Sequence, residues 1–583
     1  MLHTLSRSLR ENKGPALVTV LLSALEVVFE IVIPLYMSNL IDFGIEGGSM
    51  AAVWKFGAFL LLLAAFQLAT GVLAARIAAR ASVGFGANLR EDMYNNVQTF
   101  AFSNIDKFST ASIVTRLTTD VTNVQNAFQM LMRMAIRAPV MLVFSMIVSF
   151  RISRDISMTF LIILPILAVA LFFIIRSVFP VFTRVFRTYD ALNNVVQENV
   201  RGIRVVKSFN QEQHEIRKFG AISERIYKDF SKGERLITLN APLMQSCIYA
   251  CMIIISWLGA KAIIASGNDP ALGLTTGNLT ALITYAMQIL SSLMMLSMVF
   301  AMLTISLSSA RRIAEVIEEK TDIQNPEHPV MAVRDGAIDF DHVSFVYASK
   351  ADKKVLDDID LHIRSGETIG VIGGTGASKS SLVQLIPRLY DVTGGRLTLG
   401  GVDVRDYDLE ALRNAVAMVL QKNELFSGTI KENLRWGNEN ATDEELRHAC
   451  ELACADEFIS AMPDGYDTHI EQGGTNVSGG QKQRLCIARA LLKKPKVLIL
   501  DDSTSAVDTR TDAQIQQAFS AYIPETTKII IAQRISSVQN ADRIVVLDDG
   551  HIADVGSHEE LLRTSAIYRE VYESQQKGGE DDA

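Results

Sequence analysis

The sequence predicts a chain of two parts, a membrane domain of six α-helices followed by a soluble α/β domain. Its 583 residues exceed the roughly 150 that a single domain usually takes. Apolar runs long enough to cross a bilayer occur only before about residue 310, whereas an ordinary soluble α/β pattern begins at about residue 336. The net charge of -8 is modest and negative, so we expect no nucleic-acid partner.

Six segments come close to the 20 or so apolar residues that a membrane-spanning helix needs. They cover residues 16–40, 56–76, 130–150, 156–179, 243–265 and 279–305. An even number of spans places both chain ends on one side, and the soluble domain identifies that side as the cytoplasm. Arg151 and Arg154, after the third span, contradict the positive-inside rule locally, but the two long connections are strongly basic and are assigned to the cytoplasm. The N-terminus lacks a small-residue cleavage site, so we expect it to flank the first span rather than to be a signal peptide.

The two long connections, at about 77–129 and 180–242, are charged and amphipathic throughout. This pattern predicts helices that extend beyond the membrane, with bends near residues 103–108 and 208–215. A segment with two prolines, 316–336, then interrupts the apolar pattern and predicts a linker. The expected organisation is therefore a membrane domain over 1–315, the linker, a soluble domain over 337–573 and an acidic tail over 574–583.

Two groups of residues in the spans leave alternatives open. Glu26 and Glu30 share one helical face, as do Arg133 and Arg137, because the members of each pair are four residues apart. Charges inside a membrane face a cavity or a partner, so these residues either bind substrate or support the structure, and we favour the second. The last span is rich in methionine, which suits either a pocket for apolar compounds or ordinary helix packing. Its methionines are Met287, Met294, Met295, Met298 and Met302.

The five cysteines are scattered and predict no disulfide framework. Cys450 and Cys454 are four apart on a helical pattern, but without a second pair or a histidine cluster nearby we do not favour a metal site.

The first chemical motif of the soluble domain is a phosphate-binding loop. An aliphatic strand leads into a glycine-rich loop that opens an apolar-periodic helix, as the motif G-x-x-x-x-G-K-[ST] requires. Its backbone N–H groups would hold phosphates, Lys379 would reach the β and γ oxygens, and Ser380 would bind Mg²⁺. Ser378 stands where the motif has its second glycine, at a cost of about 1–2 kcal/mol if this position takes positive φ. The loop comprises Gly373, Gly374, Thr375, Gly376, Ala377, Ser378, Lys379, Ser380 and the following Ser381.

A second stretch, residues 476–508, contains a glycine turn that opens a helix, an aliphatic strand VLIL, and two carboxylates where the strand ends. The carboxyl ends of strands are where an α/β sheet holds ligands, so Asp501 and Asp502 are candidate site residues. The turn and helix start are formed by Ser478, Gly479, Gly480 and Gln481. This stretch, together with the phosphate loop, resembles the nucleotide-binding domain of ATP-binding cassette (ABC) proteins. The six preceding spans resemble the membrane domain of ABC exporters.

The resemblance implies ATP and Mg²⁺ as cofactors and assigns several roles. Tyr347 would stack on adenine, Asp501 would support Mg²⁺, and Gln421 would contact both Mg²⁺ and the attacking water. Residues 478–481 and the loop 505–508 would cross to the nucleotide held by a second subunit. The bends near 103–108 and 208–215 would be coupling helices that dock on the nucleotide-binding domains.

Three residues depart from the family's pattern, and all three belong to the site that this chain's own phosphate loop builds. They are Ser378, Asp502 where a catalytic glutamate is usual, and Gln533 where a histidine is usual. Aspartate is shorter than glutamate by one methylene, which sets the carboxylate of Asp502 back by roughly 1.5 Å. Glutamine, unlike histidine, cannot take up a proton and become cationic. The residues lent to a partner, Ser478–Gln481 and the loop ending at Asp508, are intact apart from Val477, which stands where leucine usually precedes the motif.

The chain therefore resembles the degenerate-site subunit of bacterial heterodimeric multidrug ABC exporters. The expected partner is a non-identical half-transporter with the catalytic Glu and His, in lipid of the cell membrane. The expected substrate is a small apolar or amphipathic compound. A slow homodimeric exporter and a membrane protein that ATP only gates remain alternatives; an importer is disfavoured because the family's importers usually keep the membrane and ATPase parts on separate chains.

Overall fold

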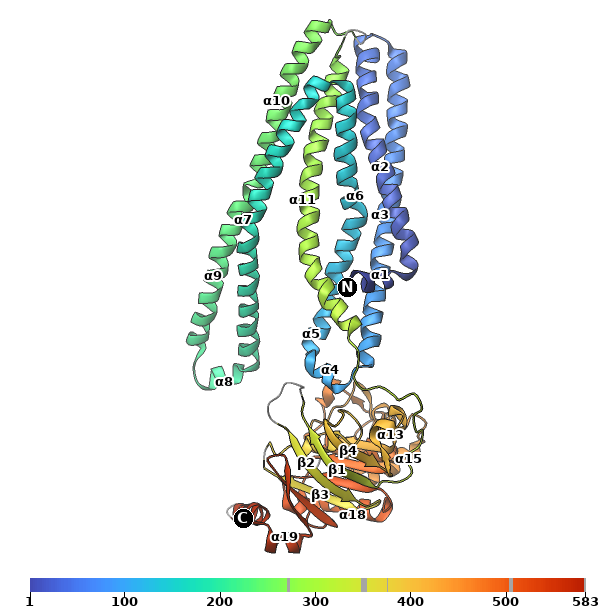
Figure 1. The fold of residues 1–583 in the computed structure, drawn as a ribbon, viewed down its shortest axis with the longest axis vertical. Helices are drawn as coiled ribbons and strands as arrows, with labels where there is room; N and C mark the ends of the chain where they lie inside the picture. The colour runs from blue at the N-terminus through green and yellow to red at the C-terminus, as the bar shows by residue number, and fades with distance from the viewer. Residues whose placement is uncertain (270–272, 348–353, 375, 503–506, 581–583) are drawn as a thin grey trace. The chain divides into compact units, whose positions relative to one another are not determined.

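The computed structural model describes residues 1–583 except 270–272, 348–353, 375, 503–506 and 581–583. The chain forms two compact units (Figure 1). The first contains Met1–Gln98 and Thr110–Glu319, and the second contains Thr99–Ser109 and Lys320–Ala583. The short segment 99–109, at the tip of the first long connection, thus belongs to the α/β unit and not to the helical one.

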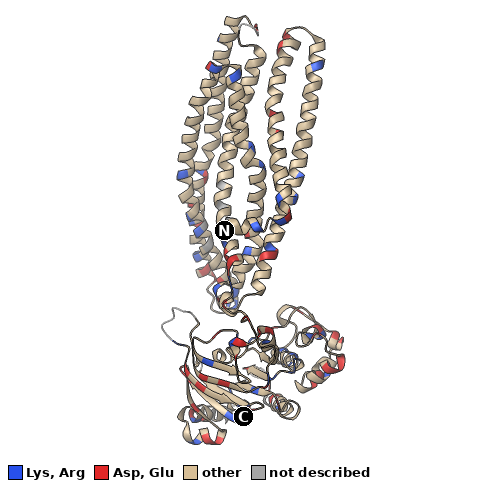
Figure 2. Ribbon diagram, turned by 45° about the vertical axis from the view of Figure 1, so that its right-hand side comes forward, with Lys and Arg blue, Asp and Glu red and all other residues tan. Residues whose placement is uncertain are grey.

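The regular elements described in the first unit are helices. Its elements are α1 (Leu2–Arg7), η1 (Arg10–Asn12), α2 (Lys13–Asn39), η2 (Leu40–Glu46), α3 (Met50–Gln98), α5 (Thr110–Thr115), η3 (Arg116–Asp120), α6 (Val121–Ile152), α7 (Arg154–Arg201), α8 (Ile203–Ser208), α9 (Glu212–Thr238), α10 (Asn240–Ser266) and α11 (Thr276–Glu318). Among the described residues, six helical stretches are long and apolar enough to span a membrane, and they confirm the six predicted segments. In the view of Figure 2 most charged residues of this unit lie in the lower half of the helices, as expected when the other half is surrounded by lipid.

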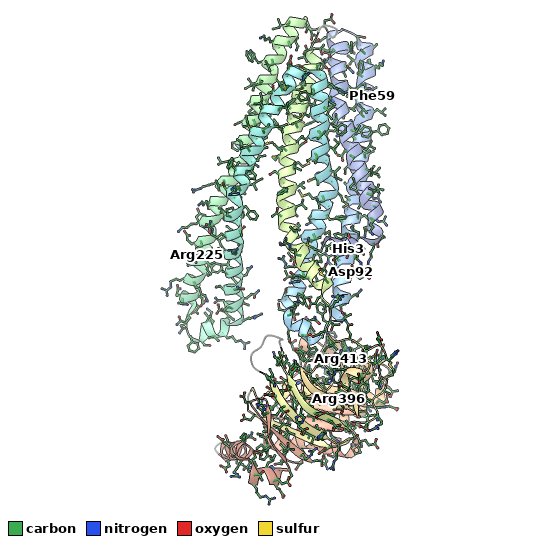
Figure 3. The ribbon with its side chains drawn as sticks, in the orientation of Figure 1. His3, Phe59, Asp92, Arg225, Arg396 and Arg413 are labelled. Atoms are coloured by element: carbon green, nitrogen blue, oxygen red, sulfur yellow. The ribbon has the colours of Figure 1, made fainter. Side chains whose placement is uncertain are left out.

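Packing inside the helical unit follows pairs of neighbours. α2 contacts α3, α6 contacts α11, and α7 contacts α9 and α10 (Figure 1). The N-terminal segment is held on α3, where Ser8 Oγ donates a hydrogen bond to Asp92 Oδ2 at 2.6 Å (Figure 3). Further along α3, the ring of Phe59 packs against Tyr36 of α2, with the ring centroids 4.4 Å apart.

Three ionisable residues of the spans form a bridge between α2 and α6. Arg137 of α6 donates to Glu26 Oε1 at 2.8 Å and to Glu30 Oε2 at 2.6 Å, both on α2. Gln288 of α11 reaches the same place and donates to the backbone oxygen of Glu30 at 3.4 Å. Three helices are therefore joined by polar contacts at this level, and Arg137, rather than Arg133, pairs with both carboxylates.

The two bends of the long connections are short helices. α4 (Phe102–Lys107) coincides with the first expected bend. The second short helix, α8, covers 203–208 and ends where we expected the bend to begin. The difference arises because α7 already ends at Arg201, with Gly202 as its C-cap, and Asn210 with a positive φ of 52° completes the turn into α9.

The second unit is built on two sheets and a small hairpin. The first sheet is antiparallel in the order β2-β1-β4-β5, and the second has the order β12-β11-β3-β10-β9-β6, parallel except for β12. The strands are β1 (Ile338–Phe345), β2 (Leu356–Ile363), β3 (Thr368–Gly373), β4 (Gly394–Leu399), β5 (Val402–Asp403), β6 (Val416–Val419), β7 (Gly428–Thr429), β8 (His469–Ile470), β9 (Val497–Asp501), β10 (Thr527–Ile531), β11 (Arg543–Asp548) and β12 (His551–Gly556). The segment before Tyr347 is the single strand β1, whose pairing with β2 contains shifts of register.

Helices cover the sheets and close two hydrophobic cores, one on each side of the parallel sheet. Besides α4, this unit contains α12 (Lys379–Gln384), α13 (Leu409–Ala415), α14 (Ile430–Arg435), α15 (Asp443–Leu452), α16 (Asp456–Ser460), α17 (Gly479–Leu492), α18 (Thr509–Tyr522), α19 (His558–Thr564) and α20 (Ala566–Glu580). The final helix runs through most of the segment 574–583 that we expected to be an acidic tail.

Candidate nucleotide site

The predicted site residues meet at one edge of the parallel sheet because its strands end in register. Asp501, the last residue of β9, pairs with Ile531 of β10, and Gly373, the last residue of β3, pairs with Leu547 of β11. Gln533 follows β10, which ends at Ile531, by two residues, and Gln421 follows β6, which ends at Val419, by two residues. This edge is the carboxyl end of the strands, where α/β sheets hold ligands.

The phosphate loop takes the backbone shape that the motif demands. Ser378 has φ 66° and ψ 22°, in the left-handed region, so its side chain carries the strain that a glycine would avoid. A Cβ added at Gly374 would meet nothing within 4 Å, and Gly376 has φ 87°, which leaves the loop backbone open to a ligand. Thr375 lies outside the described residues.

Lys379 lies along this loop. Its Nζ donates to the backbone oxygens of Gly373 at 2.8 Å and Gly374 at 2.9 Å. Burial lowers the pKa of Lys379, and the charges of Asp502 and Asp501 partly oppose that shift. The ammonium group is therefore positioned inside the loop, where it can reach a phosphate by exchanging these carbonyl contacts.

Ser380 and Asp501 supply oxygen ligands that fit Mg²⁺. Ser380 Oγ donates to Asp501 Oδ1 at 3.0 Å, and Asp501 is only 4% exposed. Burial raises the pKa of Asp501, and the charge of Asp502 raises it further. A hydroxyl and a carboxylate held together, with water or phosphate completing the shell, is the type of site that Mg²⁺ accepts. Bound Mg²⁺ would reduce the negative charge around the phosphates.

Asp502 is held by both glutamines of the site. Its Oδ2 atom accepts a hydrogen bond from Gln533 Nε2 at 2.7 Å and another from Gln421 Nε2 at 3.3 Å. Asp502 is 9% exposed and has a positive φ of 49°. Two amide donors thus occupy one oxygen of the carboxylate that stands where the resemblance leads us to expect a glutamate.

The loop with Gln533 is fixed by a residue that the sequence reasoning did not single out. Gln575 of α20 donates from Nε2 to the backbone oxygen of Gln533 at 2.7 Å and accepts from the backbone N–H of Ile535 at 2.9 Å. No motif indicated this role, because we had assigned Gln575 to a tail on charge composition alone.

Tyr347 lies beside the phosphate loop. Its hydroxyl forms a hydrogen bond with Ser381 Oγ at 2.7 Å, and its side chain is partly open, with 43% of the residue exposed. Burial raises the pKa of Tyr347, so the hydroxyl stays protonated. Part of the Tyr347 side chain is therefore accessible near the site.

Residues Ser478 to Gln481 form the start of helix α17, where the cap is already hydrogen-bonded. Ser478 Oγ accepts from the backbone N–H of Gln481 at 3.3 Å, while Gln481 Oε1 accepts from the N–H of Ser478 at 2.9 Å. Ser478 and Gly479 are exposed at the start of α17, with Gly480 next to them. Asp508 similarly caps α18 by accepting from the backbone N–H of Thr511 at 2.9 Å. Residues 505 and 506 of the neighbouring loop lie outside the described part of the chain.

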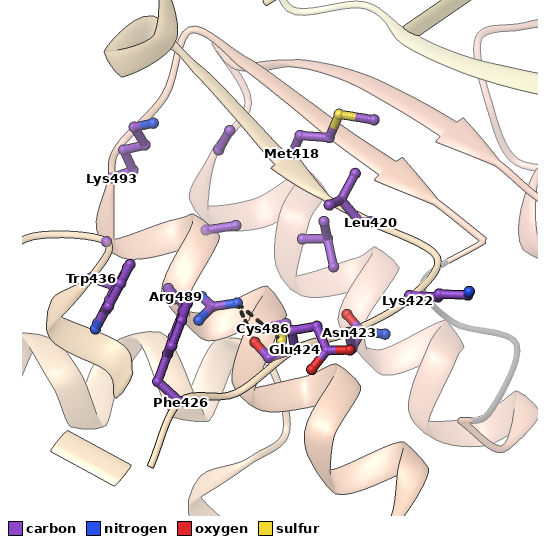
Figure 4. A pocket seen from close by; sticks show the side chains of 14 residues that line it. Met418, Leu420, Lys422, Asn423, Glu424, Phe426, Trp436, Cys486, Arg489 and Lys493 are labelled. Carbon is purple, nitrogen blue, oxygen red and sulfur yellow. Dashed lines mark hydrogen bonds between the residues drawn. The ribbon is translucent and has the colours of Figure 1, made fainter. Parts of the chain in front are cut away.

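A pocket of about 300 Å³ lies near Gln421, between the segment after β6 and helix α17 (Figure 4). Phe426 and Trp436 stack at its side with ring centroids 4.1 Å apart. Arg489 crosses it and donates to the backbone oxygen of Glu424 at 3.1 Å. The sequence reasoning missed this feature, because Phe426 and Trp436 are ten residues apart and neither belongs to a motif.

Of the two cysteines considered for a metal site, Cys450 is buried and Cys454 is half-buried. Burial raises the pKa of Cys450 to about 12, which disfavours the thiolate that a metal would need. Over the described ranges, no group of three His, Cys, Asp or Glu side chains is arranged to hold a metal ion.

Six membrane-length helices joined to a phosphate-loop α/β domain define a membrane protein that contains its own nucleotide-binding domain. Comparison with known proteins identifies its family. Residues 16–294 match the ABC transporter transmembrane region, and residues 356–505 match the family described as ABC transporter. The chain is 36% identical over 558 residues to YfiB of Bacillus subtilis, an uncharacterized ABC transporter ATP-binding protein, with 96% of each chain covered.

Two further relatives extend the comparison. The ATP-dependent lipid A-core flippase of Desulfotalea psychrophila is 32% identical over 467 residues, 80% of each chain. A solved structure of a bacterial Atm1-family ABC exporter with ATP bound shares the fold, with a TM-score of 0.79 at 24% identity over 97% of this chain and 98% of that one. This chain therefore belongs to the ABC transporter family, and its domain arrangement is that of an ABC exporter half-transporter.

Proposed function

We propose that this chain is one half of a heterodimeric, ATP-driven exporter in the cell membrane, and that its own site binds Mg²⁺-ATP but hydrolyses it poorly. The observation that supports a weak site is the capture of Asp502 Oδ2 by Gln533 at 2.7 Å and Gln421 at 3.3 Å. A carboxylate that accepts two amide hydrogen bonds is a poor base for water, and its shorter side chain adds a misplacement that can cost about a hundredfold in rate.

The partner is a non-identical half-transporter that carries the catalytic Glu and His. The partner's nucleotide site would be completed by Ser478–Gln481 of this chain. These residues form an exposed helix start, which suits a γ-phosphate. Gln533 in this chain's own site can donate a hydrogen bond to a γ-phosphate but cannot supply a cation. Hydrolysis would then occur mainly at the partner's site, and closure of the two domains around ATP would drive transport.

Two segments would carry the motion between nucleotide and membrane domains. The first is α4, and the second is the turn after α8, which presents an exposed aromatic ring, Phe209. The pocket beside Phe426 and Trp436 offers a stacked pair of aromatic rings against which Phe209 could pack, and we propose that it receives the partner's corresponding segment. Both chain ends and the nucleotide-binding domain would lie in the cytoplasm.

The proposed substrate is a small apolar or amphipathic compound. Support comes from the methionine-rich last span and from a relative named as a lipid A-core flippase. The polar bridge of Arg137 with Glu26 and Glu30 joins α2 to α6 and is proposed to support the structure, because each charge already has its partner.

The test is ATP turnover by the purified full-length chain in lipid nanodiscs, alone and together with a candidate half-transporter that carries the catalytic Glu and His. We expect the chain alone to bind ATP with little turnover and the pair to hydrolyse ATP. Robust turnover by the chain alone would overturn the heterodimer in favour of a homodimeric exporter. Vectorial transport by the reconstituted pair separates pumping from mere gating, in which accumulation only follows an existing gradient.

A further inference from the structure

Helix α4 contacts an aromatic residue of the nucleotide-binding unit through two different side chains. The hydroxyl of Tyr390 donates a hydrogen bond to Asp106 Oδ2 at 2.7 Å. The ring of Phe102 meets the ring of Tyr390 edge to face, with centroids 5.9 Å apart at 89°. Both contacts lie within one compact unit, to which segment 99–109 belongs. Tyr390 is therefore fixed to α4 by one polar and one apolar contact.

The other side of Tyr390 contacts Tyr347. Their rings lie 5.1 Å apart, also edge to face at 89°. Phe345 packs against both, at 4.8 Å from Tyr347 and 5.6 Å from Tyr390. The hydroxyl of Tyr347 in turn forms a hydrogen bond of 2.7 Å with Ser381 Oγ, next to the phosphate loop. An unbroken series of contacts thus runs from Asp106 through Tyr390 to Tyr347.

The two tyrosines differ in a way that suits transmission. Tyr347 is 43% exposed and can meet a ligand, whereas Tyr390 is 9% exposed and is packed on several sides. Close-packed rings cannot shift singly, so a displacement of Tyr347 must move Tyr390 or break its contacts. Burial and the nearby Asp106 raise the pKa of Tyr390, so its hydroxyl remains a donor to Asp106 at physiological pH.

We propose that Tyr390 is a positioning residue for Tyr347 and couples occupancy of this chain's adenine site to its own helix α4. The inference rests on the proposed function, in which Tyr347 stacks on adenine. It deepens that function, because a site that hydrolyses ATP poorly would still report to the membrane domain of the same chain that ATP is bound. Coupling between two sites is reciprocal, so changes at α4 must alter nucleotide affinity.

The experiment measures the affinity of the full-length chain for a non-hydrolysable ATP analogue, adenylyl imidodiphosphate, and for inorganic tripolyphosphate, which has no base. The variants are Asp106→Ala, Tyr390→Phe and Tyr347→Ala. Asp106 is exposed and Tyr390→Phe keeps the ring, so both variants should fold. The matched control is Ser103→Ala, which removes another hydrogen bond of α4, to Asp322 Oδ1 at 3.0 Å, without touching Tyr390.

We expect Asp106→Ala and Tyr390→Phe to lower the affinity for the ATP analogue about threefold or more. The affinity for tripolyphosphate should stay within about twofold of that of the unchanged chain. Ser103→Ala should change neither. In the Tyr347→Ala background, Asp106→Ala should have no further effect, because the route through the ring is gone. Unchanged affinity for the analogue, or equal loss for both ligands, would overturn the proposal.

Failure of the assigned role of Tyr347 would be visible separately. If Tyr347→Ala binds the analogue as tightly as the unchanged chain, the stacking role and this inference both fall. Because the analogue is not hydrolysed, the result does not depend on whether this chain's own site is catalytically weak, which the turnover measurement decides.

Discussion

Replacing Asp502 by Glu and Gln533 by His in the same chain should turn the purified protein into an active ATPase. The chain already carries an intact helix start at Ser478, so two copies that pair would each complete the other's site. Glu extends the carboxylate by roughly 1.5 Å, about one carbon–carbon bond, and His can become cationic beside the γ-phosphate. The exchange also removes the amide donor that holds Asp502 Oδ2 at 2.7 Å.

The expected gain is about a hundredfold in ATP turnover. A misplacement of about 1 Å can cost that factor by itself, and the loss of one stabilising donor costs a similar factor. Groups that act as a unit are not additive, so we do not multiply the two factors, and each single exchange should give less than the pair.

The assay is phosphate release at saturating Mg²⁺-ATP by the fraction that elutes at the size of a dimer. Adding Lys379→Ala to the repaired chain should abolish the gain and shows that turnover comes from this site. If the repaired dimer binds ATP but turns over within about threefold of the unchanged chain, positions 502 and 533 do not limit hydrolysis. Ser378 or residues supplied by the partner would then be responsible.

Three other predictions follow from the described contacts. Ser378→Gly removes about 1–2 kcal/mol of left-handed strain and adds about 0.5–1 kcal/mol of chain entropy cost, so the nucleotide-binding unit should unfold at a slightly higher temperature, whereas Ser378→Ala should not stabilise it. Arg137→Leu should cost about 3–5 kcal/mol by leaving two carboxylates unpaired in the membrane, and detergent thermal stability should recover when Glu26→Gln and Glu30→Gln are added; no recovery would contradict the bridge. Ser478→Arg in the repaired chain should abolish turnover and spare binding of the ATP analogue, and retained turnover would exclude a role in trans.

The membrane spans could be predicted because a bilayer imposes a length and an apolar composition that local sequence displays. The pairing of their charges could not. Spacing places Arg133 and Arg137 on one face of a helix, yet only the vertical offset of α2 against α6 decides that Arg137 meets Glu26 and Glu30. That offset depends on packing of the whole bundle, which no local pattern records.

The nucleotide site, too, could be predicted from the sequence only in part. Phosphate-loop spacing and the aliphatic strand VLIL placed Lys379, Ser380 and Asp501, because the motif includes its own structural context. The hydrogen bonds of Asp502 with both glutamines depend on strands distant in the sequence that end in register. Gln575 and Tyr390 were missed for the same reason, since each acts through a neighbour that only the folded chain provides.

The connection between α6 and α7 consists of the single residue Ser153, in extended conformation with φ -153° and ψ 117°. One extended residue spans only about 3.5 Å, whereas packed helix axes lie about 8–10 Å apart. The two helices therefore cannot separate at this end without partly unwinding. Any rearrangement that opens or closes the membrane domain must carry these ends of α6 and α7 as one mechanical pair, and the freedom to pivot lies at their opposite ends.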